Sequence, residues 1–426
     1  MANRLDVIIF GASGFTGKYA VYEAVSVLGD LKWGIAGRNR EKLEAVLEEM
    51  GSKANRNLRD TPITIASVEN EQSLLEMAKR CRVLVNCCGP YRFYGEPVIR
   101  ACLEAGTHHV DVSGETQFME SMQLKYHAQA QERNVYMISA CGFDSIPAEM
   151  GIVYAEKNFD GVVNSVEAYV KTYARGGRAA GGGIHYGTWA SAIHAIANWK
   201  EIRDIRRELF KTNVPRSYPI IKRRRPLSYS DVVKGVCLPF PGPDESVVMR
   251  SQRYLYEHKK KRPVQMHAYL TFKSYIVAGI LALGALFLGL MMQFSFGRRW
   301  LLKYPKLFTF GAVSHEGPSE EAMERTYFST TIKAMGWPKS SVSGASNEPS
   351  GPPTKSLTIK VTGPNPGYGA TNVALLCTAK IILKESDKMP GTGGVIPPGA
   401  AFAETSLISE LEKHEHGLKF EILSNK

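Results

Sequence analysis

The sequence predicts an α/β protein whose first part is a doubly wound parallel sheet, and three features of the chain support this. The run LDVIIF (residues 5–10) leads directly into a glycine-rich turn, after which residues 18–28 have helical spacing. A second apolar run, residues 83–87, ends in a Gly-Pro turn. Two later stretches, HHVDVSGE and VYMISACGFD, resemble further strand ends. Short apolar runs that end in turn residues are typical of strands buried on both faces.

The glycine-rich turn has the spacing Gly11-x-x-Gly14-x-x-Gly17. A strand, a glycine turn and a helix in this order are typical of dinucleotide-binding folds, because glycines let the backbone approach a pyrophosphate at the helix N-terminus. Ser13 and Thr16 add hydroxyl donors. The alternative is a glycine-rich turn without a ligand.

A second expected strand, KWGIAG, ends at Gly37, where NAD-binding folds usually carry an acid for the ribose hydroxyls. Here Arg38 and Asn39 follow instead, and Arg38 lies 21 positions after Gly17. A guanidinium suits a 2′-phosphate in charge and in donor geometry. We therefore expect NADP, with NAD as the alternative; Arg38 and Arg40 could also be solvated residues at a helix start.

In a doubly wound sheet the ligand lies outside the carboxyl ends of the strands. The residues expected at this rim are Cys88, Gly89, Pro90, Tyr91, Ser113, Gly114, Cys141, Gly142 and Asp144. Tyr91 and Asp144 are the candidates for a catalytic proton donor, against the alternatives of a packing phenol and a turn-capping carboxylate. Cys87 and Cys88 are expected to pack rather than to act as nucleophiles.

Composition and charge narrow the classes of function. The 426 residues allow two or three domains, and the formal net charge is +12. Residues 151–310 hold 26 basic and 10 acidic residues, so the positive surplus of this block exceeds the net charge of the whole chain. Because this block also holds an apolar run, anionic lipid is a better partner than nucleic acid. The seven cysteines are not expected to form a disulfide framework. No metal site is expected either, because the spacing of His108, His109, His414 and His416 does not suit metal ligands.

Residues 274–297 form an uncharged run of 24 residues with basic residues on both sides. Positive charge at both ends favours two cytoplasmic ends, and Gly284 is a plausible bend. The expectation is a hydrophobic hairpin that anchors the chain in one leaflet. A buried core helix and a dimer contact are the alternatives. The cluster Lys259, Lys260, Lys261 and Arg262 is expected to contact anionic lipid.

Several motifs occur in one order: GASGFTG, AGRNREKLE, VNCCGPYRFYGEPVIRACLEAGTHHVDVSGE and CGFDSIPAEMG. With them the chain resembles the saccharopine dehydrogenase-like oxidoreductases, and among these an animal branch associated with lipid droplets. The resemblance implies a Rossmann domain (1–150), a second α+β domain with a largely antiparallel sheet (151–365), and a C-terminal segment (366–426) that packs back on the first domain. Residues 340–355 are expected to form a flexible loop. The family's nucleotide motif falls on Gly11, Ser13, Gly14, Phe15, Thr16 and Gly17.

These observations predict an NADP-linked oxidoreductase on the cytoplasmic face of a lipid droplet or the endoplasmic reticulum membrane, with hydride transfer to or from an apolar carbonyl or enoyl substrate. One alternative is a catalytically silent dinucleotide-binding scaffold or sensor on lipid droplets. Another is a saccharopine-type amino-acid dehydrogenase, although residues 151–426 offer no clear set of groups for amino-acid carboxylates and amines. Homodimerisation is left open by the sequence.

Overall fold

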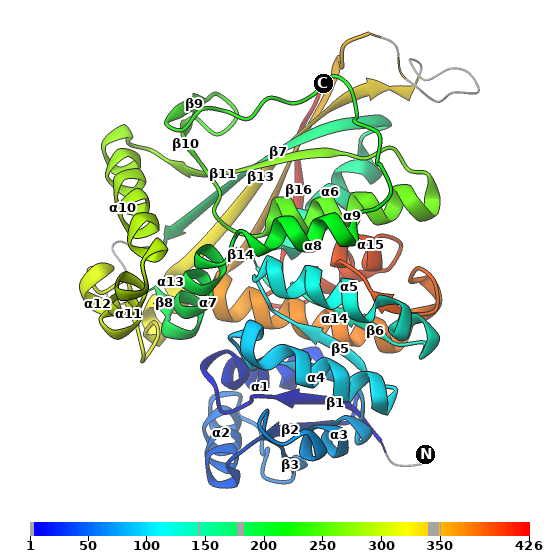
Figure 1. Cartoon of the computed structure of the whole chain (residues 1–426), viewed down its shortest axis with the longest axis vertical. Helices are drawn as coiled ribbons and strands as arrows, with labels where there is room; N and C mark the ends of the chain where they lie inside the picture. The colour runs from blue at the N-terminus through cyan, green and yellow to red at the C-terminus, as the bar shows by residue number, and fades with distance from the viewer. Residues whose placement is uncertain (1–3, 144, 177–182, 340–348, 350) are drawn as a thin grey trace.

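The computed structural model describes residues 4–143, 145–176, 183–339, 349 and 351–426, which form two seven-stranded sheets and their helices (Figure 1). The expected catalytic residue Asp144 and most of the expected loop 340–355 lie outside the described residues.

The first sheet contains the apolar runs near the N-terminus. Strand β1 (Leu5–Phe10) buries Val7 and Ile9 in one core and Ile8 and Phe10 in the other, so both faces of the sheet are covered. All pairs are parallel, in the order β15-β6-β5-β4-β1-β2-β3, which confirms the predicted doubly wound sheet. The other strands are β2 (Trp33–Gly37), β3 (Ile63–Ile65), β4 (Cys81–Asn86), β5 (His108–Asp111), β6 (Tyr136–Ile138) and β15 (Gly394–Val395).

Helices cover both faces of this sheet. On one face lie α1 (Phe15–Val27), α2 (Arg40–Lys53) and α14 (Thr371–Glu385), and on the other lie α3 (Glu71–Lys79), α4 (Tyr91–Ala105) and α5 (Thr116–Glu132). Helix α14 comes from the C-terminal segment and packs against α1, β4 and β5. The dinucleotide-binding sheet is therefore completed by residues more than 350 positions away from its first strand.

The second sheet is mostly antiparallel, in the order β16-β14-β13-β7-β11-β10-β9, with one parallel pair between β7 and β11. Helices α6 (Ile146–Asn158) and α9 (Asp244–Lys259) pack against it. This confirms the predicted second α+β unit. Its strands are β7 (Gly161–Ala174), β9 (Ser228–Ser230), β10 (Gly235–Pro239), β11 (Gln265–Phe272), β13 (Thr326–Pro338), β14 (Lys355–Pro364) and β16 (Lys419–Asn425).

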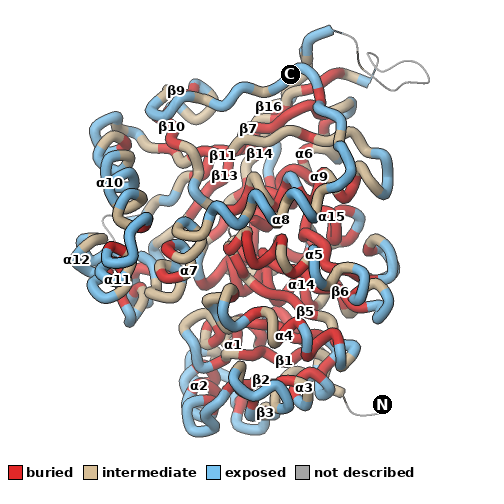
Figure 2. The backbone as a smooth tube through the Cα atoms, viewed as in Figure 1, coloured by how far each residue is buried: buried red, intermediate tan, exposed pale blue. Residues whose placement is uncertain are grey.

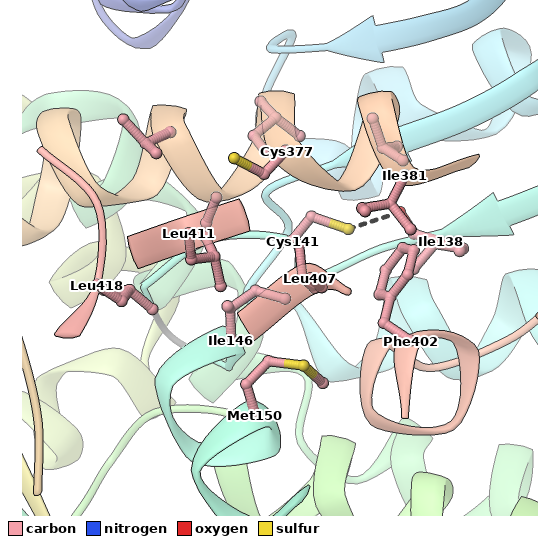
Figure 3. Packing of buried hydrophobic residues seen from close by; sticks show 14 of the residues in the cluster. Ile138, Cys141, Ile146, Met150, Cys377, Ile381, Phe402, Leu407, Leu411 and Leu418 are labelled. Atoms are coloured by element: carbon pink, nitrogen blue, oxygen red, sulfur yellow. Dashed lines mark hydrogen bonds between the residues drawn. The ribbon is translucent and has the colours of Figure 1, made fainter. Parts of the chain in front are cut away.

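The C-terminal segment joins the two sheets. It supplies β15 to the first sheet and β16 to the second, and its helices α14, α15 (Pro398–Phe402) and α16 (Leu407–Glu412) share one core with β6 and α6. Figure 3 shows this core, where Cys141, Met150, Cys377, Phe402 and Leu411 meet from five parts of the chain. The domain boundaries at 150 and 365 stay predictions, since one segment serves both sheets.

Several short elements lie outside the two large sheets. Strand β8 (Ile184–His185) pairs in parallel with β12 (Val313–Ser314), and α7 (Tyr186–Ala197) follows β8 directly. Helix α8 (Glu201–Leu209) then packs against α5, and α13 (Glu320–Arg325) precedes β13. Figure 1 shows α7 between the first sheet's helices and the group α10 to α12.

The apolar run is a single helix, α10 (Tyr275–Gln293), followed by α11 (Ser295–Lys303) and α12 (Pro305–Phe308). The predicted hairpin with a bend at Gly284 is wrong, because α10 continues through all three of its glycines and the chain turns at Phe294. Within the described residues, α10 alone is long and apolar enough to cross a membrane. The alternative of a buried core helix is also wrong, since only Ala278 and Met292 of α10 are buried (Figure 2).

The basic cluster at residues 259–262 does not lie beside α10. Strand β11, eight residues long, separates the two and spans about 26 Å at 3.3 Å per residue, and Figure 1 places α9 and α10 at opposite ends of the second sheet. Lys259 pairs with Glu404 and Lys261 with Glu156. The cluster and the apolar run therefore lie apart, and contact of the cluster with anionic lipid stays a prediction.

Candidate functional site

The glycine turn between β1 and α1 has room for a ligand at one position only. A Cβ atom on Gly17 would overlap the Gly11 carbonyl oxygen, so Gly17 allows α1 to pack on the turn. Gly11 has φ +80°, and a Cβ there would lie 2.6 Å from the Cys88 sulfur. A Cβ on Gly14 would meet only the Gly11 oxygen, at 3.2 Å. Gly14 precedes α1, which has no side-chain cap. The open side of the turn thus faces an uncapped helix N-terminus, which suits a pyrophosphate.

A pocket of about 460 Å³ opens beside the turn and is lined by Ser13, Gly14, Arg38, Asn39 and Lys42. None of these lining residues is acidic. Arg38 and Lys42 form no ion pair with any described residue, whereas the neighbouring Arg40 pairs with Glu44. Two free cations at the end of β2 fit a 2′-phosphate and would fit a bare ribose poorly.

Asn39 has a second role in this pocket. Its side-chain oxygen accepts a hydrogen bond from the Lys42 backbone N–H at 2.9 Å and so caps the N-terminus of α2. This cap fixes the first turn of α2, from which Lys42 projects. Lys42 was not among the residues predicted from the sequence, although its position in the first turn of a helix that starts directly after Arg38 and Asn39 was a usable signal.

The thiols at the carboxyl edge of the sheet are neutral; Cys141 is buried, and Cys87 and Cys88 are half-buried. Burial raises the pKa of Cys88 to about 12 and raises the pKa values of Cys87 and Cys141 further. A thiol that stays protonated at neutral pH is a poor nucleophile. Raised pKa values favour the packing role expected for Cys87 and Cys88, which stays a prediction.

Tyr91 is turned into the end of the sheet rather than towards the pocket. Its hydroxyl donates to the Asn86 carbonyl oxygen at 2.9 Å and accepts from the Val112 N–H at 3.4 Å. Burial raises its pKa well above 10. The phenol thus holds β4 and β5 together, and the catalytic role expected for Tyr91 finds no support in this geometry.

Parts of the second domain and of the C-terminal segment close over the glycine turn. The Phe15 ring stacks on His185 of β8, with centroids 5.0 Å apart, and meets the edge of Tyr368 at 4.6 Å. The His185 N–H donates to the Tyr368 hydroxyl at 3.1 Å. Asn372 donates its side-chain N–H to the carbonyl oxygens of Thr16 and Tyr368 at 3.2 and 2.7 Å. The cofactor turn is therefore covered by an aromatic wall built from two distant parts of the chain.

Glu115 joins the first sheet to α7. Its carboxylate accepts hydrogen bonds from the backbone N–H groups of Tyr91 and Arg92 at 2.8 and 2.9 Å, and from the Ser191 hydroxyl at 2.8 Å. The N-terminus of α4, which lies at the ligand edge of the sheet, is therefore already occupied by a carboxylate.

Sequence reasoning missed His185, Tyr368 and Asn372, because their contacts with the turn depend on the packing of the second domain. The remaining expected rim residues lie at the carboxyl edge: Gly89 and Pro90 between β4 and α4, Ser113 and Gly114 after β5, and Gly142 after β6. Among the described residues, no group of three or more His, Cys, Asp and Glu side chains is placed to hold a metal ion.

Comparisons with known proteins identify residues 7–138 as an NADP-binding domain. The family model described as the saccharopine dehydrogenase NADP binding domain matches residues 7–138. A human protein named saccharopine dehydrogenase-like oxidoreductase is 40% identical over 98% of this chain and 97% of its own. A Caenorhabditis elegans protein named lipid droplet localized protein is 33% identical over 96% of both chains.

The fold has a solved counterpart. The structure of apo saccharopine dehydrogenase (L-Glu forming) from Saccharomyces cerevisiae matches 99% of this chain and 100% of its own with a TM-score of 0.53, at 11% identity. That likeness concerns the fold alone. The identity with the human relative over nearly the whole of both chains goes further. With its NADP-binding sheet and its cationic pocket, the chain belongs to the saccharopine dehydrogenase-like oxidoreductases.

Proposed function

We propose that this protein is an NADP-linked oxidoreductase of a lipid surface, which transfers a hydride to or from an apolar carbonyl or enoyl substrate. The observation that carries the proposal is the pocket in which Arg38 and Lys42 stand free beside the open glycine turn. The exposed apolar helix α10 of the same chain supports the lipid part of the proposal.

The residues around the turn have separate roles in holding the cofactor. Ser13, Gly14, Phe15, Thr16 and Gly17 would hold the pyrophosphate at the N-terminus of α1, and Gly11 keeps the turn tight. Arg38 and Lys42 would hold the 2′-phosphate, with Asn39 fixing the start of α2. Cys88, Gly89 and Pro90 would border the cofactor at the end of β4. When bound, NADP supplies the hydride chemistry.

The chain's own contribution to the reaction is an oriented site. Phe15, His185 and Tyr368 cover one side of the turn, while Ser13 and Gly14 stay exposed on the side of the pocket. Asn372 fixes the Thr16 carbonyl and so holds the turn in place. Hydride addition to a carbonyl or conjugated enoyl carbon leaves an alkoxide or enolate that must also take up a proton. Asp144, which lies outside the described residues, stays the candidate donor.

An apolar substrate fits the site better than an amino acid does. At the ligand edge Glu115 already accepts from the two N–H groups at the start of α4, so these donors are not free for a substrate carboxylate. The lipid droplet relative from C. elegans points the same way. We place the protein on the cytoplasmic face of a lipid droplet or of the endoplasmic reticulum membrane, where apolar substrates gather.

A screen for NADPH oxidation tests this function. Long-chain aldehydes, ketones and enoyl thioesters would be offered in detergent to the full chain and to Gly14→Val, which blocks the turn, with the products identified by mass spectrometry. Turnover by the parent alone would support the proposal. Tight NADPH binding without turnover of any of these classes would favour the silent scaffold. Turnover of saccharopine would favour the amino-acid dehydrogenase.

A further inference from the structure

The outer face of α10 is built of large apolar side chains. Ile276, Ile280, Leu283, Phe287 and Leu290 recur every three or four residues and so share one face of the helix. All of them are exposed, Ile276 by 76% and Leu283 by 69%. Singly exposed apolar residues are ordinary, but a continuous stripe of five on one helix marks a surface that is covered by something else.

The inner face of α10 packs on the second domain through small residues near its start and through larger ones near its end. Ala278 is fully buried against Val236 and Leu238 of β10, and Ala282 packs beside it. A surface helix of a water-soluble protein turns its large apolar residues inward. In α10 the five large residues of the stripe face outward instead, and Val277, Leu281 and Leu286 are exposed as well. Helix α10 is therefore held on the second domain near its two ends, while most of its residues between them are exposed (Figure 2).

Both ends of α10 are fixed to the same domain. The first turn packs on β10 through Ala278, and the last turn packs through Met292 on Ile193 of α7 and Leu301 of α11. The Arg298 guanidinium donates to the Met292 carbonyl oxygen at 2.9 Å and satisfies the C-terminal end of the helix. At 19 residues, α10 is about 28 Å long, which is enough to cross the hydrocarbon core of a bilayer. Crossing would, however, require one end to leave its contacts.

The helices that follow carry the residues typical of a membrane interface. Trp300 and Tyr304 are exposed on and just after α11, Leu307 on α12, and Phe310, which follows α12, is 98% exposed. Arg299 and Lys303 are exposed beside them and form no ion pair with any described residue. Aromatic and basic residues together favour the headgroup region of a lipid layer, where each ring has an apolar and a wet side.

We propose that α10, α11 and α12 form one in-plane lipid-docking surface, in which α10 lies parallel to a phospholipid monolayer with its Ile276 to Leu290 stripe among the acyl chains, and in which α11 and α12 lie at the depth of anionic headgroups. This proposal rests on the lipid-surface function proposed above and adds its geometry: the chain enters one leaflet only. A single leaflet is also all that a droplet offers, since its interior is oil rather than a second aqueous phase.

Depth-dependent quenching tests the geometry. Single tryptophans replace Ile276, Leu283 and Leu290, and each protein is bound to vesicles of phosphatidylcholine and phosphatidylserine whose acyl chains carry bromine at one chosen depth. The parent protein, with its native tryptophans, provides the baseline. An in-plane helix predicts the same depth profile at all three positions. A profile in which Leu283→Trp is quenched from the bilayer centre and the other two from the interface would overturn the proposal.

Introducing negative charge into the apolar stripe tests the surface itself. Leu283→Asp with Phe287→Asp should lower vesicle binding at least tenfold and leave NADPH binding unchanged, because both side chains are exposed and remote from the turn. Ile422→Asp is the matched control, an exposed apolar residue on β16 at the opposite edge of the second sheet. Arg299→Gln and Lys303→Gln should each weaken binding about fivefold on vesicles with phosphatidylserine, and far less on phosphatidylcholine alone.

Other outcomes separate this inference from the function on which it rests. A parent protein that oxidises NADPH with an apolar substrate but does not bind vesicles would overturn the docking surface and leave the function standing. A parent that forms a dimer in detergent-free buffer, which Leu283→Asp converts to a monomer, would show that a second copy of this chain covers the stripe, and would also overturn the proposal.

Discussion

His185 of β8 stacks on Phe15 of the glycine turn, with ring planes 18° apart and centroids 5.0 Å apart. His185 also caps α7, because its Nδ1 accepts a hydrogen bond from the Gly187 N–H at 3.0 Å. Helix α7 in turn packs against α10 and α11. A short unit of β8 and α7 thus touches the cofactor turn on one side and the lipid-docking surface on the other.

Replacement of His185 should separate its two contacts. His185→Ala loses the ring stacking and the helix cap, and should destabilise the fold by about 1–2 kcal/mol and weaken NADPH binding several-fold. His185→Asn keeps a capping oxygen but no ring, so it should recover most of the stability but not the affinity. Thermal unfolding and a fluorescence titration with NADPH measure the two effects. Equal affinity in all three proteins would mean that the stacking does not hold the turn.

Gly14 and Gly17 should respond differently to the same change. Gly14→Val should abolish NADPH and NADH binding, because the valine side chain would block the ligand's approach to the turn. Stability should change little, because a Cβ at this position would contact only the Gly11 oxygen. Gly17→Ala should unfold at a clearly lower temperature, because its Cβ would overlap the Gly11 carbonyl and approach the Ala12 Cα to 2.8 Å. Circular dichroism melting together with cofactor titration distinguishes the two. Undiminished binding by a folded Gly14→Val protein would contradict the assignment of this turn.

Glu149 should make stability depend on pH. Burial raises the pKa of its carboxyl from 4.5 to about 7, against the opposing hydrogen bond from Ser251. A raised folded-state pKa gives a contribution that is complete below about 4.5 and is lost as the pH rises through about 7. Glu149→Gln removes that loss. Relative to the parent, the variant should therefore gain on the order of 1–3 kcal/mol between pH 5 and pH 8 in urea unfolding. A stability difference that does not change with pH would contradict this.

The sequence predicted the parallel sheet and the turn because both depend on local patterns. An apolar run of six residues followed by glycines at fixed spacing determines strand, turn and helix within about 30 residues. Arg38 could be predicted as a cofactor contact because it directly follows the next strand. The C-terminal contribution to both sheets entered only through the resemblance to a family, because no local pattern in residues 366–426 says which sheet they join.

The differences between prediction and structure in the middle of the chain also have a physical cause. Three glycines in α10 suggested a bend, but glycine only weakens a helix, by about 1 kcal/mol each, and packing of Ala278 and Met292 at the two ends keeps it continuous. Lys259 to Arg262 were grouped with the apolar run because they are near it in sequence. An extended strand carries the chain away, and acidic partners neutralise two of these four residues. The cover over the turn, with His185 and Asn372, is a product of tertiary packing.

Cofactor preference tests the central claim most directly. Calorimetric titration of the parent with NADPH and NADH should show tighter binding of NADPH, since Arg38 and Lys42 line the pocket that would hold a 2′-phosphate. Lys42→Gln should weaken NADPH alone, and Arg38→Asp should erase or reverse the preference, because an acid suits the free ribose hydroxyls. Lys53→Gln, which removes a cation on the last turn of α2 outside the pocket, is the control and should change neither affinity. Equal affinities for the two cofactors, before and after Arg38→Asp, would contradict the account.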